Sequence, residues 1–338
     1  MTRTVFGSLA RIADFDTRPF DVVPIEQAAW ATGDYAVGEV VAMSPELHAV
    51  ENRIGDMISV EIGDRIVGAF GCRAATLEGV GSWRDVRNGK MQALTSAGLF
   101  GAFTSYSMFL PEPASLEYRG HVVRGSKKVT MGDFALQQSG GNYTVPTILL
   151  IGTSMSAGKT TTGRIACKLL SEAGLRVIGV KLTGAGRYRD ILSFKNAGAA
   201  EIYDFVDVGL PSTVVSEDRF RTAIRPLLQH IGARHPNVAV VEAGASPLEP
   251  YNGAAAIVEL GDNICCSILC ATDPYAVVGV QKAFDFSPDI VAGPATNTSA
   301  AIDLVAELSG LRGINVMDPD SIPEFRSVLA SKLDRRLD

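Results

Sequence analysis

The sequence predicts an α/β protein, with a mostly parallel, doubly wound sheet in the second part of the chain and a smaller β-rich domain before it. After Tyr143, apolar segments alternate with amphipathic ones, which is the pattern of repeated βα units. Several apolar segments show no alternation of apolar and polar residues, as expected of strands that helices cover on both faces. We therefore expect two domains, residues 1–143 and residues 144–338.

Composition excludes several classes of protein. The chain has 338 residues, of which 46% are hydrophobic, enough to bury a large core. Its formal net charge of −6 argues against a general binder of nucleic acid or of anionic membranes. No apolar run is as long as a transmembrane helix, and the N-terminus lacks a signal-peptide core. We expect a small-molecule substrate, with neither nucleic acid nor a membrane as partner.

The five cysteines indicate a cytoplasmic protein with reduced thiols, because their number is odd and most lie in apolar runs. A metal cluster at 265–270 is the weaker interpretation. In a strand, Cys265 points away from Cys266 and Cys270, and no histidine is nearby. Core packing explains these thiols better.

The first domain shows short apolar segments separated by glycines and charges, which suggests a barrel or a sandwich. The segments are 37–43, 57–62, 65–70, 116–123 and 127–131. Gly63-Asp64 indicates a hairpin between two of them, and Leu94–Phe109 is a candidate helix. Polar residues near its turns are weak candidates for a substrate pocket, since solvated loops explain each of them better: Arg73, Glu78, Arg84, Asp85, Arg119 and His121. The polar segment Gln137–Asn142 is the expected linker.

The second domain contains the expected βα units. The predicted strands are 147–152, 176–182, 205–208, 238–242, 264–271, 290–292 and 314–317. The predicted helices are 159–173, 190–197, 216–232, 274–285, 299–308 and 321–332. In such sheets, ligands bind beyond the carboxyl ends of the strands.

The first predicted strand of this domain leads into a phosphate-binding loop. A buried strand, a small-residue loop at 152–158, Lys159-Thr160 and a helix follow in the order of a P-loop. Loop amides and the helix N-terminus converge on an anion, Lys159 adds positive charge, and the Thr160 hydroxyl suits Mg²⁺. Five residues, not the usual four, separate Gly152 from Gly158. The candidate nucleotide contacts are Gly152, Thr153, Ser154, Ser156, Ala157, Gly158, Lys159, Thr160 and Thr161.

Two later strand ends carry charged candidates. Residues 238–241 run directly into Glu242, which suits the carboxylate that holds Mg²⁺ beside a P-loop. The loop after residue 180 brings cations and a hydroxyl that suit a substrate carboxylate or a transferring phosphoryl group, although a solvated loop remains an alternative. These residues are Lys181, Thr183, Arg187 and Arg189. Asp190 is a candidate Mg²⁺ ligand or a helix cap.

Three residues at the remaining strand ends have both a binding and a capping interpretation. Asp273 precedes Pro274, as an N-cap does, yet both Asp273 and Tyr275 are candidate substrate contacts. Asn297 offers a donor and an acceptor for an adenine edge. Helix capping by Asn297 or Thr298 explains this position at least as well.

The phosphate loop resembles that of dethiobiotin synthetase and of the amide-forming cobyrinic acid synthases. Those enzymes also have a glycine, five residues and then Gly-Lys-Thr or Gly-Lys-Ser. The strand end at 240–246, VVEAGAS, is similar to their VEGAGG, and Lys181 matches their Lys-Pro element, with Leu182 in place of proline. The chain resembles more closely a P-loop family with a GTDxxxGKxTT loop and a VEGQGS strand end, some of whose members are D-glutamate N-acetyltransferases. The resemblance covers residues 145–300 and leaves out the β-rich half, where that family carries a Rossmann-like domain.

The resemblance implies a homodimeric, ATP- and Mg²⁺-dependent enzyme that activates a small carboxylate-bearing metabolite by phosphoryl transfer, as a ligase or a kinase. It implies that Lys159 and Thr160 bind the ATP phosphates and Mg²⁺, that Glu242 completes the Mg²⁺ site, and that Lys181 and the loop 183–189 hold an anionic substrate. We expect Lys159, Lys181 and Glu242 to be the catalytic residues. One alternative is an N-acetyltransferase of an acidic amino acid, with the loop holding the phosphates of acetyl-CoA. Another is a nucleotide-dependent regulatory or chaperone module. Ser154 stands where MinD-like ATPases have their signature lysine, which disfavours a switch ATPase of that kind.

Overall fold

A computed structural model describes residues 3–43, 49–138, 140–244, 246–284 and 286–334. It divides into two compact units, each assembled from several segments of the chain. The β unit comprises Met1–Gln137, Ala185–Arg189 and Phe205–Ala223; the α/β unit comprises Gln138–Gly184, Asp190–Asp204 and Ile224–Asp338.

The α/β unit is built on a six-stranded sheet. Its strands are β13 (Thr147–Gly152), β14 (Val177–Thr183), β15 (Glu201–Asp204), β16 (Val238–Ala243), β17 (Ile264–Cys270) and β18 (Ile290–Ala292). Their order is β15-β14-β16-β13-β17-β18, and every neighbouring pair is parallel. Because β16 lies between β13 and β14, the ends of β13, β14 and β16 come together at one edge.

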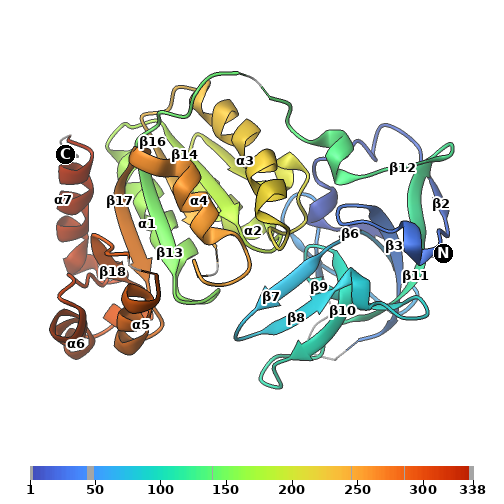
Figure 1. Cartoon of the computed structure of the whole chain (residues 1–338), viewed down its shortest axis with the longest axis horizontal. Helices are drawn as coiled ribbons and strands as arrows, with labels where there is room; N and C mark the ends of the chain where they lie inside the picture. The colour runs from blue at the N-terminus through green and yellow to red at the C-terminus, as the bar shows by residue number, and fades with distance from the viewer. Residues whose placement is uncertain (1–2, 44–48, 139, 245, 285, 335–338) are drawn as a thin grey trace. The chain divides into compact units, whose positions relative to one another are not determined.

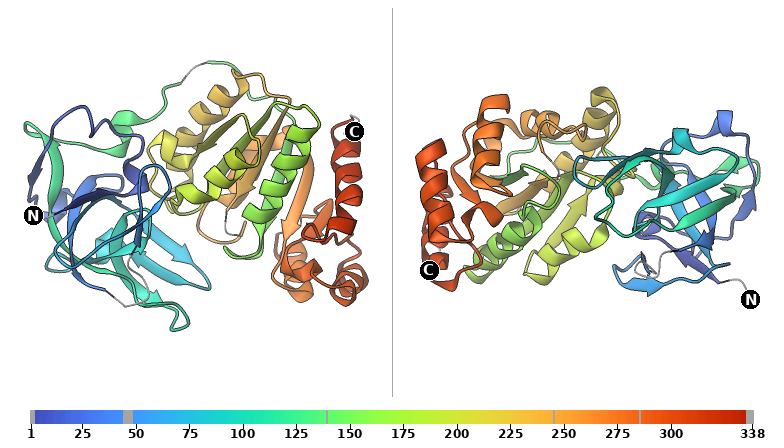
Figure 2. Two further views of the ribbon diagram at one scale, coloured as in Figure 1. Left: turned by 180° about the vertical axis from the view of Figure 1, so that it is seen from behind. Right: turned by 90° about the horizontal axis from the view of Figure 1, so that it is seen from below.

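Helices connect the strands. They are α1 (Lys159–Glu172), α2 (Tyr188–Asn196), α3 (Glu217–Gly232), α4 (Gly253–Leu260), α5 (Pro274–Phe284), α6 (Ser299–Ser309) and α7 (Ile322–Lys332). Helices α1 and α4 cover opposite faces of the sheet (Figures 1 and 2). All residues of β13 and β16 are therefore buried. The predicted mostly parallel, doubly wound α/β fold is confirmed.

Two predicted strands of the α/β half are wrong. Residues Phe205–Val208 form a 3₁₀ helix, and the strand precedes them as β15, where Glu201 and Asp204 conceal its apolar character. The predicted strand 314–317 is not formed: Gly313, the residue before it, makes an isolated bridge to Val291. Its apolar side chains Ile314 and Val316 are buried in the core, which explains the apolar pattern without a strand.

The β unit contains a closed barrel. Its strands are β1 (Thr4–Phe6), β2 (Asp21–Val23), β3 (Tyr35–Ala42), β4 (Ala49–Glu51), β5 (Met57–Ser59), β6 (Arg65–Phe70), β7 (Cys72–Ala75), β8 (Gly79–Ser82), β9 (Lys90–Thr95), β10 (Leu99–Tyr106), β11 (Ser115–Arg124) and β12 (Lys127–Lys128). Strands β6, β3, β11, β9 and β10 pair in that order, and β10 pairs again with β6. Of the two predicted alternatives, the barrel is therefore present.

Two local predictions in this half are wrong. The segment Leu94–Phe109 is not a helix, because β9 and β10 pair with each other across a turn at Gly98, whose φ is +86°. The hairpin at Gly63-Asp64 is also absent, since β5 pairs with β4 while β6 pairs with β3. In the first place a local hairpin replaces the predicted helix. In the second, the non-local pairing of β6 with β3 in the barrel overrides the local turn signal, while β4 and β5 form a separate two-stranded sheet.

None of the helices in the described part of the chain is long and apolar enough to cross a membrane.

The central strand of the α/β unit offers a test of this core. Ile148 is fully buried in β13, so Ile148→Ala leaves a cavity and should lower the free energy of unfolding by about 2–5 kcal/mol. Urea denaturation followed by far-UV circular dichroism measures the change. Leu248→Ala removes a side chain that is 55% exposed and should cost at most about 0.5 kcal/mol. Equal losses in the two variants would contradict the assigned core.

Candidate functional site

The loop between β13 and α1 closes around the side chain of Lys159. Gly158, just before α1, has a φ of +96°, a conformation that favours glycine. A Cβ atom on Gly152 would lie 2.5 Å from Nζ of Lys159, so a side chain there would displace the ammonium group. The two glycines of the predicted motif are thus required by the loop conformation and by the position of Lys159.

The Lys159 ammonium group is buried inside this loop. Its side chain is 2% exposed, and Nζ donates to the carbonyl oxygens of Ser154 at 2.6 Å and Met155 at 3.4 Å. Burial lowers the pKa of Lys159, against the opposing effect of the Glu242 carboxylate. The loop therefore holds a desolvated cation whose direct hydrogen-bond partners, among the residues that the structure describes, are backbone carbonyls.

Other loop residues differ in how their polar groups are satisfied. The Ser154 hydroxyl is buried and has no hydrogen-bond partner within the described residues. Thr153 Oγ1 accepts a hydrogen bond from the amide of Thr272, at the end of the neighbouring strand β17. Ala157 is buried, whereas Ser156 is exposed and Thr161 is half-buried. An unsatisfied buried hydroxyl is costly, so Ser154 is the loop side chain that gains most from a ligand acceptor.

Glu242 meets the first turn of α1. Because β16 is the parallel neighbour of β13, the Glu242 carboxylate lies beside the loop, and Thr160 Oγ1 donates to its Oε2 at 3.0 Å. Adjacent ligands in an octahedral Mg²⁺ shell are about 2.9 Å apart, given metal–oxygen distances of about 2.1 Å. The residues therefore fit Mg²⁺ as two neighbouring ligands. Within the described residues, no cluster of three histidine, cysteine or acidic side chains forms a metal site of its own.

Lys181 lies near the second oxygen of the Glu242 carboxylate, the one that Thr160 does not contact. Its Nζ donates to Asp190 at 2.5 Å and lies 3.7 Å from Oε1 of Glu242, and the residue is 4% exposed. Burial alone would lower the pKa of Lys181, but the charges of Asp190 and Glu242 outweigh it and the pKa is raised. Glu242 thus lies between Thr160 and a lysine that is charged at neutral pH, and Asp190 joins the cluster through Lys181.

The predicted substrate residues do not all gather at this cluster. Thr183 is fully buried and its hydroxyl donates to the carbonyl of Gly244 at 2.9 Å. Arg187 and Arg189 belong to the β unit. There the Glu51 carboxylate accepts the amides of Tyr188 at 2.6 Å and Arg189 at 3.0 Å, so it caps α2 in the way proposed for Asp190. The sequence shows no local signal for this cap, because Glu51 is distant along the chain.

At the later strand ends the structure shows side chains that cap helices. Asp273 Oδ1 accepts the amides of Tyr275 and Ala276, both at 3.0 Å. Tyr275 is 69% exposed. Asn297 is also exposed, and it is the next residue, Thr298, whose hydroxyl caps α6. Contacts of Asp273, Tyr275 and Asn297 with a ligand remain predictions.

The sequence analysis did not identify Gly293. This residue directly follows β18 and supports the phosphate loop that follows β13. Its φ is +85°, and a Cβ atom there would lie 2.3 Å from the carbonyl oxygen of Ala157. Any other residue would push against the loop just before Lys159. The Gly-Pro pair after a predicted strand was the available signal.

Comparisons with known proteins give matches to solved structures alone, since no family model and no curated protein matches the chain. The hydrogenase maturation factor HypB of Archaeoglobus fulgidus is 11% identical, with a TM-score of 0.40 over 56% of this chain and 91% of that one. HypB of Helicobacter pylori, solved with nickel, is 15% identical, with a TM-score of 0.37 over 57% and 88% of the two chains. A DUF1611 family protein of Anabaena variabilis is 17% identical, with a TM-score of 0.37 over 57% and 58%. Because their TM-scores are 0.40 or lower, these matches carry no weight, and the parallel α/β fold with its P-loop is assigned from the sheet and the loop described above.

The position of Gly293 yields a paired prediction. Gly293→Ala and Gly261→Ala both force alanine into a positive-φ conformation, which costs about 1–3 kcal/mol of stability in either case. Only Gly293→Ala also collides with the phosphate loop, because nothing lies within 4 Å of a Cβ on Gly261. Titration with a fluorescent ATP analogue should therefore show weakened binding in Gly293→Ala alone. Unchanged binding of the analogue in Gly293→Ala would contradict the role of Gly293 in supporting the phosphate loop.

Proposed function

We propose that the chain binds ATP with Mg²⁺ and activates a small carboxylate-bearing metabolite by phosphoryl transfer. The contact between Thr160 and Glu242, beside the buried Lys159, carries this proposal. It brings together a hydroxyl and a carboxylate that suit Mg²⁺ and a buried cation, where the phosphate loop meets the end of β16; phosphoryl transfer uses groups of these kinds.

The polyphosphate would satisfy two groups that the protein leaves poorly compensated. In the described part of the chain, Lys159 Nζ donates to backbone carbonyl oxygens, and phosphate oxygens would supply a negative charge close to the buried ammonium group. The Ser154 hydroxyl would donate to a phosphate oxygen in place of its missing partner. Loop amides and the N-terminus of α1 add further donors.

Thr160 and Glu242 would hold Mg²⁺. When bound, the ion would neutralise developing charge on the phosphoryl oxygens. Lys181 keeps Glu242 in place from its far side through the ion pair at 3.7 Å. Its charge is already compensated by two carboxylates, so we assign Lys181 a positioning role at Glu242 as well as the predicted contact with an anionic substrate. Direct ligation by Asp190 would require it to leave Lys181.

We propose a carboxylate-bearing metabolite as the phosphoryl acceptor because of the resemblance to dethiobiotin synthetase. The enzyme would then be a ligase or a kinase. Acetyl transfer from acetyl-CoA uses the same loop chemistry, because the loop recognises phosphate oxygens in either cofactor. Thermal-shift titration separates the two cofactors: ATP with Mg²⁺ should raise the melting temperature, and acetyl-CoA should not. The homodimer remains a prediction that light scattering can test.

Two lysines of α1 provide a matched test of nucleotide binding. Lys159→Ala should reduce ATP affinity by at least about tenfold, since it removes a charge-assisted contact worth roughly 1.5–3 kcal/mol. Lys168→Ala removes a lysine whose side chain is 65% exposed on the same helix and should bind ATP as the parent does. Isothermal titration calorimetry measures both. Parental affinity in Lys159→Ala would refute the proposed loop.

Turnover distinguishes an activating enzyme from a regulatory module. ADP release by the full chain should depend on one carboxylate-bearing metabolite and fall in Glu242→Gln, which keeps the shape of the side chain but lowers its affinity for Mg²⁺. A coupled assay over a panel of such metabolites measures it. ADP release at the same rate with and without every metabolite would contradict phosphoryl transfer to a metabolite.

A further inference from the structure

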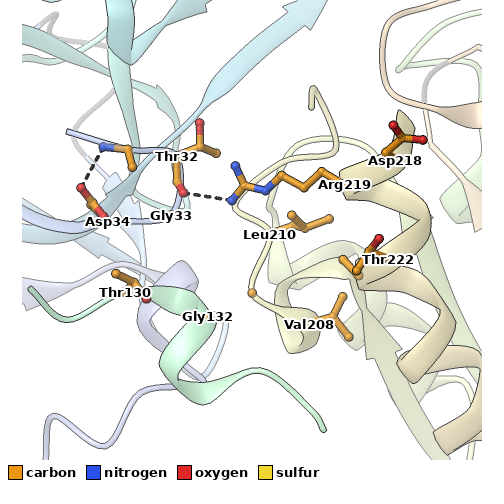
Figure 3. Close-up of a pocket in the computed structure, with 13 residues that line it drawn as sticks. Thr32, Gly33, Asp34, Thr130, Gly132, Val208, Leu210, Asp218, Arg219 and Thr222 are labelled. Carbon is orange, nitrogen blue, oxygen red and sulfur yellow. Dashed lines mark hydrogen bonds between the residues drawn. The ribbon is translucent and has the colours of Figure 1, made fainter. Parts of the chain in front are cut away.

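The β unit holds a cavity that the nucleotide site does not use. Its volume is about 480 Å³, within the range of small-molecule pockets. The turn before β3, the 3₁₀ segment near Gly132, residues Val208–Leu210 and the first turns of α3 form its walls, and all of these belong to the β unit. Figure 3 shows the Arg219 side chain extending from α3 across this space towards Thr32 and Gly33.

Arg219 is the uncompensated charge of the cavity. Its Nη2 donates to the carbonyl oxygen of Thr32 at 3.1 Å, and no carboxylate within the described residues forms an ion pair with it. A guanidinium group carries five N–H donors, so most of its donors are available to a ligand. Partial burial and the positive charge of Arg84 lower the pKa of Arg219, against the opposing effect of the Asp34 carboxylate.

The cavity wall holds two carboxylates, Asp34 and Asp218, and neither forms an ion pair with Arg219; other groups already engage Asp34. Asp34 is 2% exposed, and it accepts hydrogen bonds from Lys128 at 2.6 Å, from the Ala31 amide at 2.8 Å and, at 3.2 Å, pairs with His121. In Figure 3, Asp218 lies at the end of α3 away from the guanidinium group. The Arg219 guanidinium group is therefore the cation that this cavity offers to an anionic ligand, and it has no direct carboxylate partner within the described residues.

We propose that this cavity binds a small metabolite through a carboxylate or phosphate group that pairs with Arg219. The oxyanion would take the free guanidinium donors, in the bidentate geometry that arginine favours. Thr222, which lines the cavity one turn from Arg219, offers a further hydroxyl donor, and Leu210 provides an apolar wall for the rest of the molecule. This site is separate from the phosphate loop, and it does not depend on the proposed reaction.

Tryptophan fluorescence can detect binding here. The chain has two tryptophans, Trp30 and Trp83, and both lie in the β unit. Trp83 Nε1 donates to the hydroxyl of Thr32, a residue of the cavity wall, at 2.8 Å. The emission of the full chain is therefore a readout for ligands at this site.

The test titrates the full chain with succinate and with inorganic phosphate. We expect saturable binding of at least one probe with a Kd of about 1 mM or lower. Arg219→Gln should weaken that binding about tenfold or more, and Arg221→Gln, two residues along the same helix, should not. Thr222→Phe, an exposed position where the larger ring would fill the cavity, should also weaken it without altering the fold.

Each outcome decides the proposal. Phosphate binding that survives Lys159→Ala but is lost in Arg219→Gln assigns the ion to this cavity and not to the phosphate loop. Succinate binding alone identifies a carboxylate ligand, and phosphate binding alone identifies a phosphorylated one. No saturable binding of either probe, or binding that Arg219→Gln and Thr222→Phe leave unchanged while circular dichroism shows both variants folded, overturns the proposal.

Discussion

The α/β unit depends on the compensation of two buried ammonium groups by one glutamate. Lys159 and Lys181 are both nearly inaccessible to solvent, and their charges repel each other. Glu242 lies close enough to act on both, and Asp190 supplies the second carboxylate for Lys181. Lys181 is thereby held as a cation, while Lys159 remains undercompensated. The imbalance is located where a polyphosphate would place its negative charge.

The strand order creates this arrangement. Lys181 and Glu242 face each other in the register of β14 and β16, and Glu242 pairs in turn with Leu150 of β13. Three segments that are distant along the chain thus end at one edge of the sheet. Gly293 then fixes the loop from the other side, at the end of β18. Residues that support the loop therefore come from strands on both sides of β13. Support from rigid strands on both sides preorganises the site.

The sequence predicted those parts of the molecule whose signal is local. The phosphate loop, the buried parallel strands and the carboxylate near the end of β16 each occupy one short segment with a distinctive pattern. Partners set by tertiary contacts were not predictable: Glu51 at the start of α2, the ion pair between Lys181 and Asp190, and the hydroxyl of Thr183 turned inward to Gly244. The cavity at Arg219 belongs to this class, since its walls come from four separate segments. In the β unit, closure of the barrel decided pairings that local turn chemistry misassigned.

The most direct measurement of the central claim is the Mg²⁺ dependence of ATP affinity in the parent chain and in Thr160→Val. If Thr160 and Glu242 hold the ion against the polyphosphate, Mg²⁺ should tighten ATP binding in the parent. Most of that gain should disappear when the hydroxyl is replaced by a methyl group of similar size. An equal gain from Mg²⁺ in both proteins, or no effect of Mg²⁺ in either, would contradict the account.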